Sequence, residues 1–181
     1  MVLHFDPGAG VGAIGSLEEL ILAMDKDPRP AGYMDAMLRL DMGPGPLEPF
    51  CRWNTRHYTR QCIHRTGQHE LLLICYEAGQ RTSIHDYDSQ MAWIKPVTGI
   101  IQEERFKIEA DGQLKRHGTR LLLPGKLAYM ASRNCIQRHS NPGGGRAITL
   151  NLYARPLRSW RMYNERTGLV SLGGTAGGRG A

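Results

Sequence analysis

The residues that could do chemistry gather between positions 79 and 99. Gly79, His85 and Gly99 have the spacing of a metal site in a small β-barrel, and Tyr87 follows the histidine by two residues. Side chains two apart on a strand point to the same face, so His85 and Tyr87 are expected to share one cavity. An imidazole is a common metal ligand. A phenol, with a reference pKa of about 10, binds as phenolate only where the metal lowers that pKa strongly. Tyr87 is therefore either a ligand or a buried tyrosine with a satisfied hydroxyl.

A second pair of polar residues lies downstream, at Gln137 and His139. The carbonyl oxygen of Gln137 is a weak ligand for a late transition metal. His139 lies two positions further on, on the same face of an extended strand. It replaces Gln137 as a ligand if the strand slips or bulges, or it is a loop residue beside the following glycines. The sequence leaves both interpretations open.

These residues need strands to position them, and short apolar or alternating runs separated by turn residues fill the chain from Tyr58 onward. Such runs occur at 70–76, 91–95, 99–109, 120–123, 127–131, 136–139 and 147–153. Many short strands at this spacing predict a β-sandwich or barrel. Ser16 and Glu19 form a capping-box pattern that predicts a helix over 16–26, and a second short helix is expected from Gly32. We predict an all-β protein with a single small β-barrel or jelly roll and short N-terminal helices.

The predicted domain covers residues 16–168, with the helices of about 16–45 as a cap over one end of the barrel. Residues 1–15 have no hydrophobic periodicity and predict a flexible N-terminus. After Pro156 the chain is expected to wrap around the outside of the barrel. Residues 169–181 are rich in glycine and predict a disordered tail.

Composition excludes several classes of function. The 181 residues carry 23 Lys and Arg against 17 Asp and Glu, a net charge of +6, but the basic residues are scattered and no nucleic-acid-reading motif accompanies them. No apolar run reaches the roughly 18 residues of a membrane span, and the start lacks a signal-peptide pattern. Neither nucleic acid nor membrane is expected as a partner, and a cytoplasmic location is expected. The four cysteines form no CxxC pair and predict free thiols.

The motifs resemble those of the cupin superfamily. The segment 79–99 resembles the first cupin motif, with Tyr87 in place of the second histidine and Ala92 in place of the glutamate. The segment 118–141 resembles the second motif, with Gln137 in place of the third metal-binding histidine. Further short segments resemble the cysteine dioxygenase family, and they lie at 58–60, 83–86, 129–130, 141–142 and 149–157. This resemblance runs from about Leu17 to Gly168.

The resemblance implies a chemistry. In that family three histidines hold iron(II), the thiolate and amine of cysteine complete the metal shell, and dioxygen is added to sulfur to give a sulfinate. Carried over, His85 is a metal ligand, and Tyr87, Gln137 or His139 supplies the others. Arg60, beside Tyr58, corresponds to the arginine that clamps the substrate carboxylate, a role that suits a planar guanidinium. Relatives that take 3-mercaptopropionate have glutamine there, so Arg60 favours an amino-acid thiol.

The resemblance also assigns a proton relay. Tyr153 corresponds to the tyrosine whose hydroxyl points at substrate and dioxygen. The family's Ser-His-Tyr relay becomes Thr149, Asn151 and Tyr153 here, which removes the histidine that tunes the phenol. The residue that cross-links to this tyrosine in some members is Ala92, so no thioether forms.

Our first hypothesis is a divergent cysteine-dioxygenase-like enzyme that oxidises the sulfur of L-cysteine or a related amino-acid thiol with dioxygen. It uses one divalent transition metal, with iron expected first and nickel or copper as alternatives. Relatives in natural-product pathways make a sulfonamide from cysteine, so a tailoring step of this kind is included. The alternatives are a non-oxidative cupin, such as an amino-acid isomerase or binding protein using His85, Tyr87 and His139, and a catalytically inactive family member. A monomer or a homodimer is expected.

Overall fold

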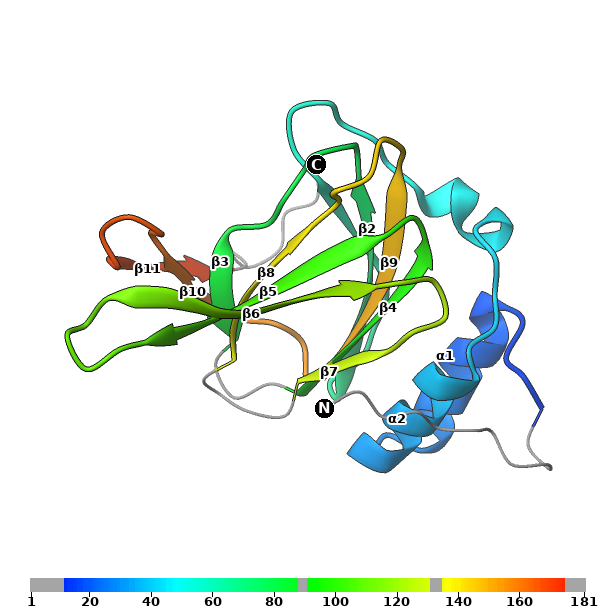
Figure 1. The fold of residues 1–181 in the computed structure, drawn as a ribbon. Helices are drawn as coiled ribbons and strands as arrows, with labels where there is room; N and C mark the ends of the chain where they lie inside the picture. The colour runs from blue at the N-terminus through cyan, green and yellow to red at the C-terminus, as the bar shows by residue number, and fades with distance from the viewer. Residues whose placement is uncertain (1–11, 88–90, 131–134, 175–181) are drawn as a thin grey trace.

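Two antiparallel β-sheets form the body of the protein in a computed structural model, which describes residues 12–87, 91–130 and 135–174 (Figure 1). One sheet has the strand order β1 (Thr59–Arg65), β2 (His69–Tyr76), β9 (Ala147–Ala154), β4 (Met91–Thr98) and β7 (Ala128–Met130). The other has the order β11 (Val170–Gly174), β10 (Ser159–Tyr163), β3 (Ile84–Tyr87), β8 (Ile136–Ser140), β5 (Ile101–Ile108) and β6 (Leu114–Leu122). The predicted all-β class is confirmed.

The N-terminal helices are α1 (Leu17–Lys26) and α2 (Pro30–Arg39), followed by the 3₁₀ helix η1 (Gly45–Phe50). The predicted capping box is present: Ser16 Oγ accepts from the backbone N–H of Glu19 at 3.2 Å, and the Glu19 carboxylate accepts from Ser16 N–H at 3.2 Å. This pairing satisfies two of the free donors at the start of α1. None of the described helices has the length and apolar character needed to span a membrane.

The helices cover the outer face of the five-stranded sheet, whereas the sequence predicted a cap over one end of a barrel. Lys95 on β4 donates from Nζ to the carbonyl oxygens of Met37 and Leu38 at the end of α2, at 2.9 and 3.2 Å. A buried apolar cluster joins both helices to the same face of the sheet, through Leu71 and Leu73 of β2 among others. The sheet therefore has two buried faces, which explains the continuous apolar run of β2.

The interior between the two sheets holds the side chains that alternate along β2 with those facing the helices. Leu72, Ile74 and Tyr76 of β2 belong to a second buried cluster, together with Tyr153 of β9 and Ala92 of β4. Ala92 is the direct strand partner of Tyr153. Its methyl group therefore lies beside the Tyr153 ring, and a larger side chain at position 92 would approach that ring more closely.

The predicted boundaries are wrong at both ends. Ile14 was expected in the flexible N-terminus, but it is 2% exposed and pairs with Leu40 through a parallel bridge. The chain after Pro156 was expected to wrap outside, but β10 joins the sheet beside β3. The tail expected to be disordered from 169 contains β11, whose backbone pairs with β10 although most of its side chains are exposed. Strand pairing satisfies backbone groups without needing apolar side chains, which is why composition gave no sign of it. The rest of both predictions, at 1–11 and 175–181, lies outside the described residues.

Candidate active site

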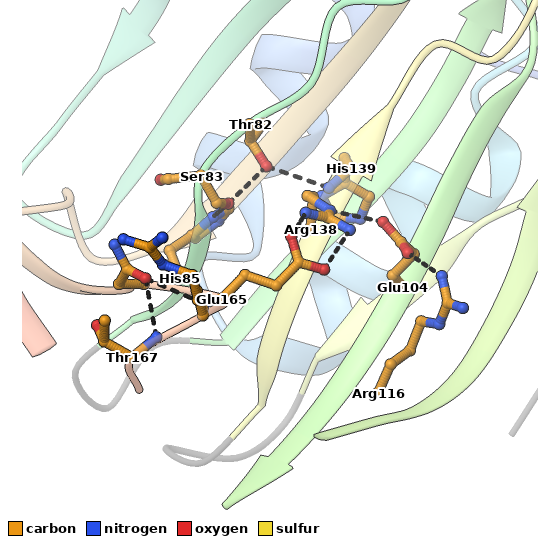
Figure 2. A network of polar contacts seen from close by, with 11 residues as sticks. Thr82, Ser83, His85, Glu104, Arg116, Arg138, His139, Glu165 and Thr167 are labelled. Atoms are coloured by element: carbon orange, nitrogen blue, oxygen red, sulfur yellow. Dashed lines mark hydrogen bonds and ion pairs between the residues drawn. The ribbon is translucent and has the colours of Figure 1, made fainter. Parts of the chain in front are cut away.

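His85 is held in one tautomer inside the barrel. Its Nδ1 lies 2.8 Å from the backbone carbonyl oxygen of Ser83, and a carbonyl can only accept, so Nδ1 carries the proton. Burial lowers the pKa of His85 to about 4, so the imidazole is neutral at pH 7 and Nε2 carries a lone pair. Figure 2 shows the support for this arrangement: Thr82 Oγ1 donates to Ser83 O at 2.9 Å and accepts from the backbone N–H of His139 at 3.1 Å.

A chain of hydroxyl and amide groups runs from His85 across the interior to β9. The Tyr87 hydroxyl lies 2.8 Å from His85 Nε2 and 3.1 Å from the Tyr153 hydroxyl. Asn151 Nδ2 donates to the Tyr153 oxygen at 3.3 Å, and Thr149 Oγ1 donates to Asn151 Oδ1 at 2.7 Å. The five side chains thus form one continuous hydrogen-bonded path between the two sheets.

The direction of that path follows from its ends. Because His85 Nε2 can only accept, Tyr87 must donate to it, and the Tyr87 oxygen then accepts from Tyr153. Burial raises the pKa of Tyr87 well above 10, and the nearby Tyr153 adds to this, so the phenol keeps its proton. The amide of Asn151 has no titratable proton, so proton transfer along the path ends at the Tyr153 hydroxyl. A histidine at position 151 would have carried the proton further.

A small pocket of about 130 Å³ opens beside His85. Arg60 and Tyr58, which the sequence predicts as substrate-binding residues, line it together with His85 and Tyr87. The guanidinium carbon of Arg60 lies 5.3 Å from the centre of the Trp160 ring, within the range of a cation–π contact. The pocket therefore combines a cation, a neutral imidazole and phenol hydroxyls in a space that fits a molecule of a few heavy atoms.

Gln137 and His139 lie on the same interior face but outside the lining of this pocket. Gln137 is the strand partner of His85, so the two side chains leave neighbouring positions on one face. His139 Nε2 lies 3.5 Å from Glu103 Oε1. Burial would raise the pKa of the Glu103 carboxyl, but His139 and two arginines, Arg105 and Arg120, hold it well below its usual range. His139 therefore faces an anionic carboxylate.

The donor set fits a metal ion in part. The Nδ1 hydrogen bond of His85 to a backbone carbonyl is the usual support of an imidazole that binds metal through Nε2. Both amide atoms of Gln137 are buried without a hydrogen-bond partner in the described structure. Orphaned buried polar atoms indicate an absent partner. Against this, no three His, Cys, Asp or Glu side chains of the described ranges converge beside His85.

Sequence reasoning missed the contribution of β10. Trp160 and Met162 line the pocket, and they are the strand partners of Tyr87 and His85. The alternation of Trp160, Arg161 and Met162 between apolar and charged side chains was the available signal of a strand. Glu103 was also missed, because in the sequence it lies in the polar run Gln102–Arg105 and nothing there marks it as buried.

Comparisons with known proteins agree with this architecture. A family model described as "Cysteine dioxygenase type I" matches residues 34–166. Cysteine dioxygenase type 1 of Danio rerio is 27% identical over 130 residues, covering 66% of this chain and 62% of that protein. The Bos taurus protein of the same name is 23% identical over 136 residues, covering 71% and 66%. The chain thus matches less than two thirds of the length of these relatives.

Solved structures share the fold. A Klebsiella pneumoniae protein with a double-stranded β-helix domain superposes with a TM-score of 0.55 and 13% identity, covering 64% of this chain and 87% of that one. A Thermus thermophilus protein superposes with a TM-score of 0.51 and 16% identity, covering 60% and 93%. At this identity the likeness shows the fold alone, and it is the predicted cupin barrel. With its two facing sheets, its motif spacing and a family match over residues 34–166, this chain belongs to the cysteine dioxygenase type I family.

Proposed function

We propose that this protein oxidises the sulfur of L-cysteine, or of a closely related amino-acid thiol, with dioxygen in the pocket beside His85. The observation that carries the proposal is that Arg60 and His85 line one cavity of about 130 Å³. One end of that cavity offers a guanidinium for a carboxylate, and the other offers an imidazole nitrogen with the tautomer of a metal ligand.

Each residue has a proposed role. Arg60 binds the substrate carboxylate through its planar fork, with Trp160 below the guanidinium and the Tyr58 hydroxyl nearby. This contact orients the thiol toward His85. The buried hydroxyls of Tyr87 and Tyr153 lie 3.1 Å apart and share a proton in their hydrogen bond. Together they exclude water from the reacting end of the pocket.

The proposed cofactor is one divalent transition metal, with iron as the first expectation and nickel or copper as alternatives. His85 Nε2 and Gln137 would hold it, and Tyr87 or His139 would complete the set after a side-chain rotation. When bound, the metal supplies activation of dioxygen and of the substrate thiolate. The net reaction converts one thiol and one dioxygen into one sulfinic acid: sulfur loses four electrons and dioxygen gains four.

The proposal is tested by loading metal-free protein anaerobically with iron, nickel, copper or manganese, and then measuring oxygen uptake and sulfinate formation. L-Cysteine is compared with cysteamine, which has the thiol and amine but no carboxylate. We expect Arg60→Gln to raise KM for L-cysteine roughly 10- to 100-fold, because a charge-assisted hydrogen bond is worth about 1.5–3 kcal/mol. KM for cysteamine should not change.

Arg56→Gln is the matched control, since Arg56 is an exposed arginine on the preceding loop. It should leave both substrates unaffected. Absence of oxygen uptake with all four metals would overturn the proposal.

One observation favours a second candidate, a non-oxidative enzyme that moves the α-proton of an amino acid. Tyr87 already donates to the His85 lone pair, which forms a complete acid–base pair without a metal. This candidate predicts exchange of the α-proton of a bound amino acid in deuterated water, at a rate that a chelator does not change. The oxidative proposal predicts no such exchange in chelator-treated protein.

A further inference from the structure

A second group of possible metal ligands lies on the other face of the five-stranded sheet, where the helices cover it. Asp25 is in the last turn of α1, His64 is near the end of β1, and His69 begins β2. His64 is the strand partner of Leu71, which packs toward the helices, so the two histidines and the helix end meet on the outer face of the sheet. Among the described residues this is the one compact trio of His, Cys, Asp or Glu donor atoms.

The two distances from the Asp25 carboxylate to the histidines suit a tetrahedral metal site. Asp25 Oδ1 lies 3.4 Å from His64 Nε2 and 3.5 Å from His69 Nε2, and all three atoms lie within 4.8 Å of one another. Zinc bonds of about 2.0–2.2 Å place two tetrahedral ligands roughly 3.3–3.5 Å apart. A distance of 3.5 Å is long for a hydrogen bond but right for two atoms that share an ion.

The buried histidine of the trio has an unsatisfied nitrogen aimed into this space. His69 is 1% exposed, and its Nε2 has no hydrogen-bond partner in the described structure. The other ring nitrogen, Nδ1, lies 3.2 Å from the Tyr33 hydroxyl and 3.3 Å from Thr66 Oγ1. With its proton on Nδ1, His69 donates to one of these oxygens and presents the Nε2 lone pair to a metal, as supported metal-binding histidines do.

Charge and access also suit a cation. The C-terminal end of a helix carries partial negative charge, so Asp25 in the last turn of α1 is at an unfavourable end unless a cation lies beside it. The side chains of Asp25 and His64 are 44% and 25% exposed, which leaves one side of the trio open to water. A metal can enter from solvent and keep a water molecule as its fourth ligand.

We propose that Asp25, His64 and His69 form a second metal site, independent of the pocket beside His85, and that it takes zinc with water in the fourth position. Two imidazoles and one carboxylate are a ligand set that zinc accepts in tetrahedral geometry. The bound ion ties the end of α1 to the hairpin of β1 and β2.

The test is a zinc titration of the full-length, untagged, metal-free protein against a chromophoric chelator. Cobalt(II), whose visible d–d bands report tetrahedral coordination, serves as a second probe. We expect His64→Ala and Asp25→Asn to weaken one zinc equivalent by more than the roughly 10- to 100-fold that loss of an outer-shell partner costs. Both variants should also lose the cobalt bands and the zinc-dependent rise in Tm.

Three controls separate this site from other binders. His85→Ala removes the candidate ligand of the interior pocket, His117→Ala removes an exposed histidine on β6, and Cys62→Ser removes an exposed thiol on β1. Each should keep the zinc equivalent and the cobalt bands. Zinc binding by His64→Ala and Asp25→Asn as tight as in the wild type would overturn the proposal. So would a wild-type protein that binds no zinc beyond what His85→Ala loses.

Discussion

At the scale of single residues, the hydrogen bond between Tyr87 and His85 determines how this site differs from a site with three histidines. The Ser83 carbonyl fixes the proton on Nδ1, so Nε2 is free to accept, and the Tyr87 hydroxyl takes that lone pair at 2.8 Å. A metal at Nε2 must displace this phenol or deprotonate it. Since burial raises the pKa of Tyr87 well above 10, displacement is the easier course in the metal-free protein.

We therefore predict that Tyr87→His raises the affinity of the interior pocket for iron(II) or zinc by more than roughly tenfold, because it adds an imidazole and removes the competing hydroxyl. The measurement is a chelator-competition titration in a His64→Ala background, which removes the second site. Tyr87→Phe is the control, since it removes the hydroxyl without adding a ligand. Equal affinity in the two variants would show that position 87 does not face the metal.

At the scale of elements, the turn between β4 and β5 depends on Gly99. Its φ is +73°, a conformation that side-chain-bearing residues rarely adopt, and a Cβ there would lie 2.6 Å from the Cβ of Ala147 on β9. Gly79 has a similar φ of +76°, but a Cβ there would meet nothing within 4 Å. The two glycines that bound the first motif thus share a positive φ, and only Gly99 also lacks room for a Cβ.

This difference predicts unequal costs of substitution. Gly79→Ala should destabilise the fold by about 1–2 kcal/mol, the cost of a left-handed alanine. Gly99→Ala carries the same cost and adds the clash with β9, so its loss of unfolding free energy should be clearly larger. Urea unfolding of both variants measures this. Equal losses would mean that the turn moves away from β9 at no cost.

Strands β5, β6 and β8 are joined on their outer face by an ion network, drawn in Figure 2. Arg138 donates from Nε to Glu104 at 2.6 Å and from Nη1 to Glu165 at 2.7 Å, and Arg116 donates to Glu104 at 2.7 Å. The hydrogen bond from Arg138 is the main cause that lowers the pKa of Glu104 below its ordinary value of 4.5, with Arg116 adding to it against burial.

Because the folded state lowers this pKa, the carboxylate stabilises the fold above about pH 4.5, and the contribution is lost as pH falls through the lower folded value. Glu104→Gln should cost roughly 1–3 kcal/mol at pH 7. The difference from the wild type should shrink below pH 4.5, where protonated glutamate resembles glutamine. Urea unfolding at about pH 7 and about pH 3.5 checks this, and a difference that does not change with pH would contradict it.

At the scale of the whole molecule, the pocket depends on the hairpin of β10 and β11, which follows the last motif segment at 149–157. Strand β10 places Trp160 opposite Tyr87 and beneath Arg60, and β11 places Gly173 against the indole. A Cβ at Gly173 would lie 2.3 Å from Trp160 Nε1. Strand β11 therefore limits the position of the Trp160 side chain, which lines the pocket from the neighbouring strand β10.

We predict that Gly173→Ala displaces the indole and raises KM for L-cysteine roughly two- to fivefold through loss of a cation–π contact of about 0.5–1 kcal/mol, with little change in kcat. Tryptophan fluorescence should shift even without substrate. Gly174→Ala is the matched control, since a Cβ there would be 3.4 Å from its nearest neighbour, the Arg158 carbonyl oxygen. An unchanged fluorescence spectrum in Gly173→Ala would contradict the contact.

The sequence by itself determined the local structure. The capping box at Ser16, the strand period from Tyr58 onward and the motif spacing between Gly79 and Gly99 act over a few residues, so they can be read from the chain and they led to the correct fold class. It also indicated which residues differ from the family pattern, such as Tyr87 and Gln137.

Only the tertiary structure decided which of these residues meet. The pairing of β10 with β3 brings Trp160 to the pocket, and the pairing of β5 with β8 brings Glu103 beside His139. The approach of α1 to the start of β2 places Asp25 beside His69, 44 positions away in the chain. Such contacts depend on register and packing between distant elements, and no local pattern in a single sequence encodes them.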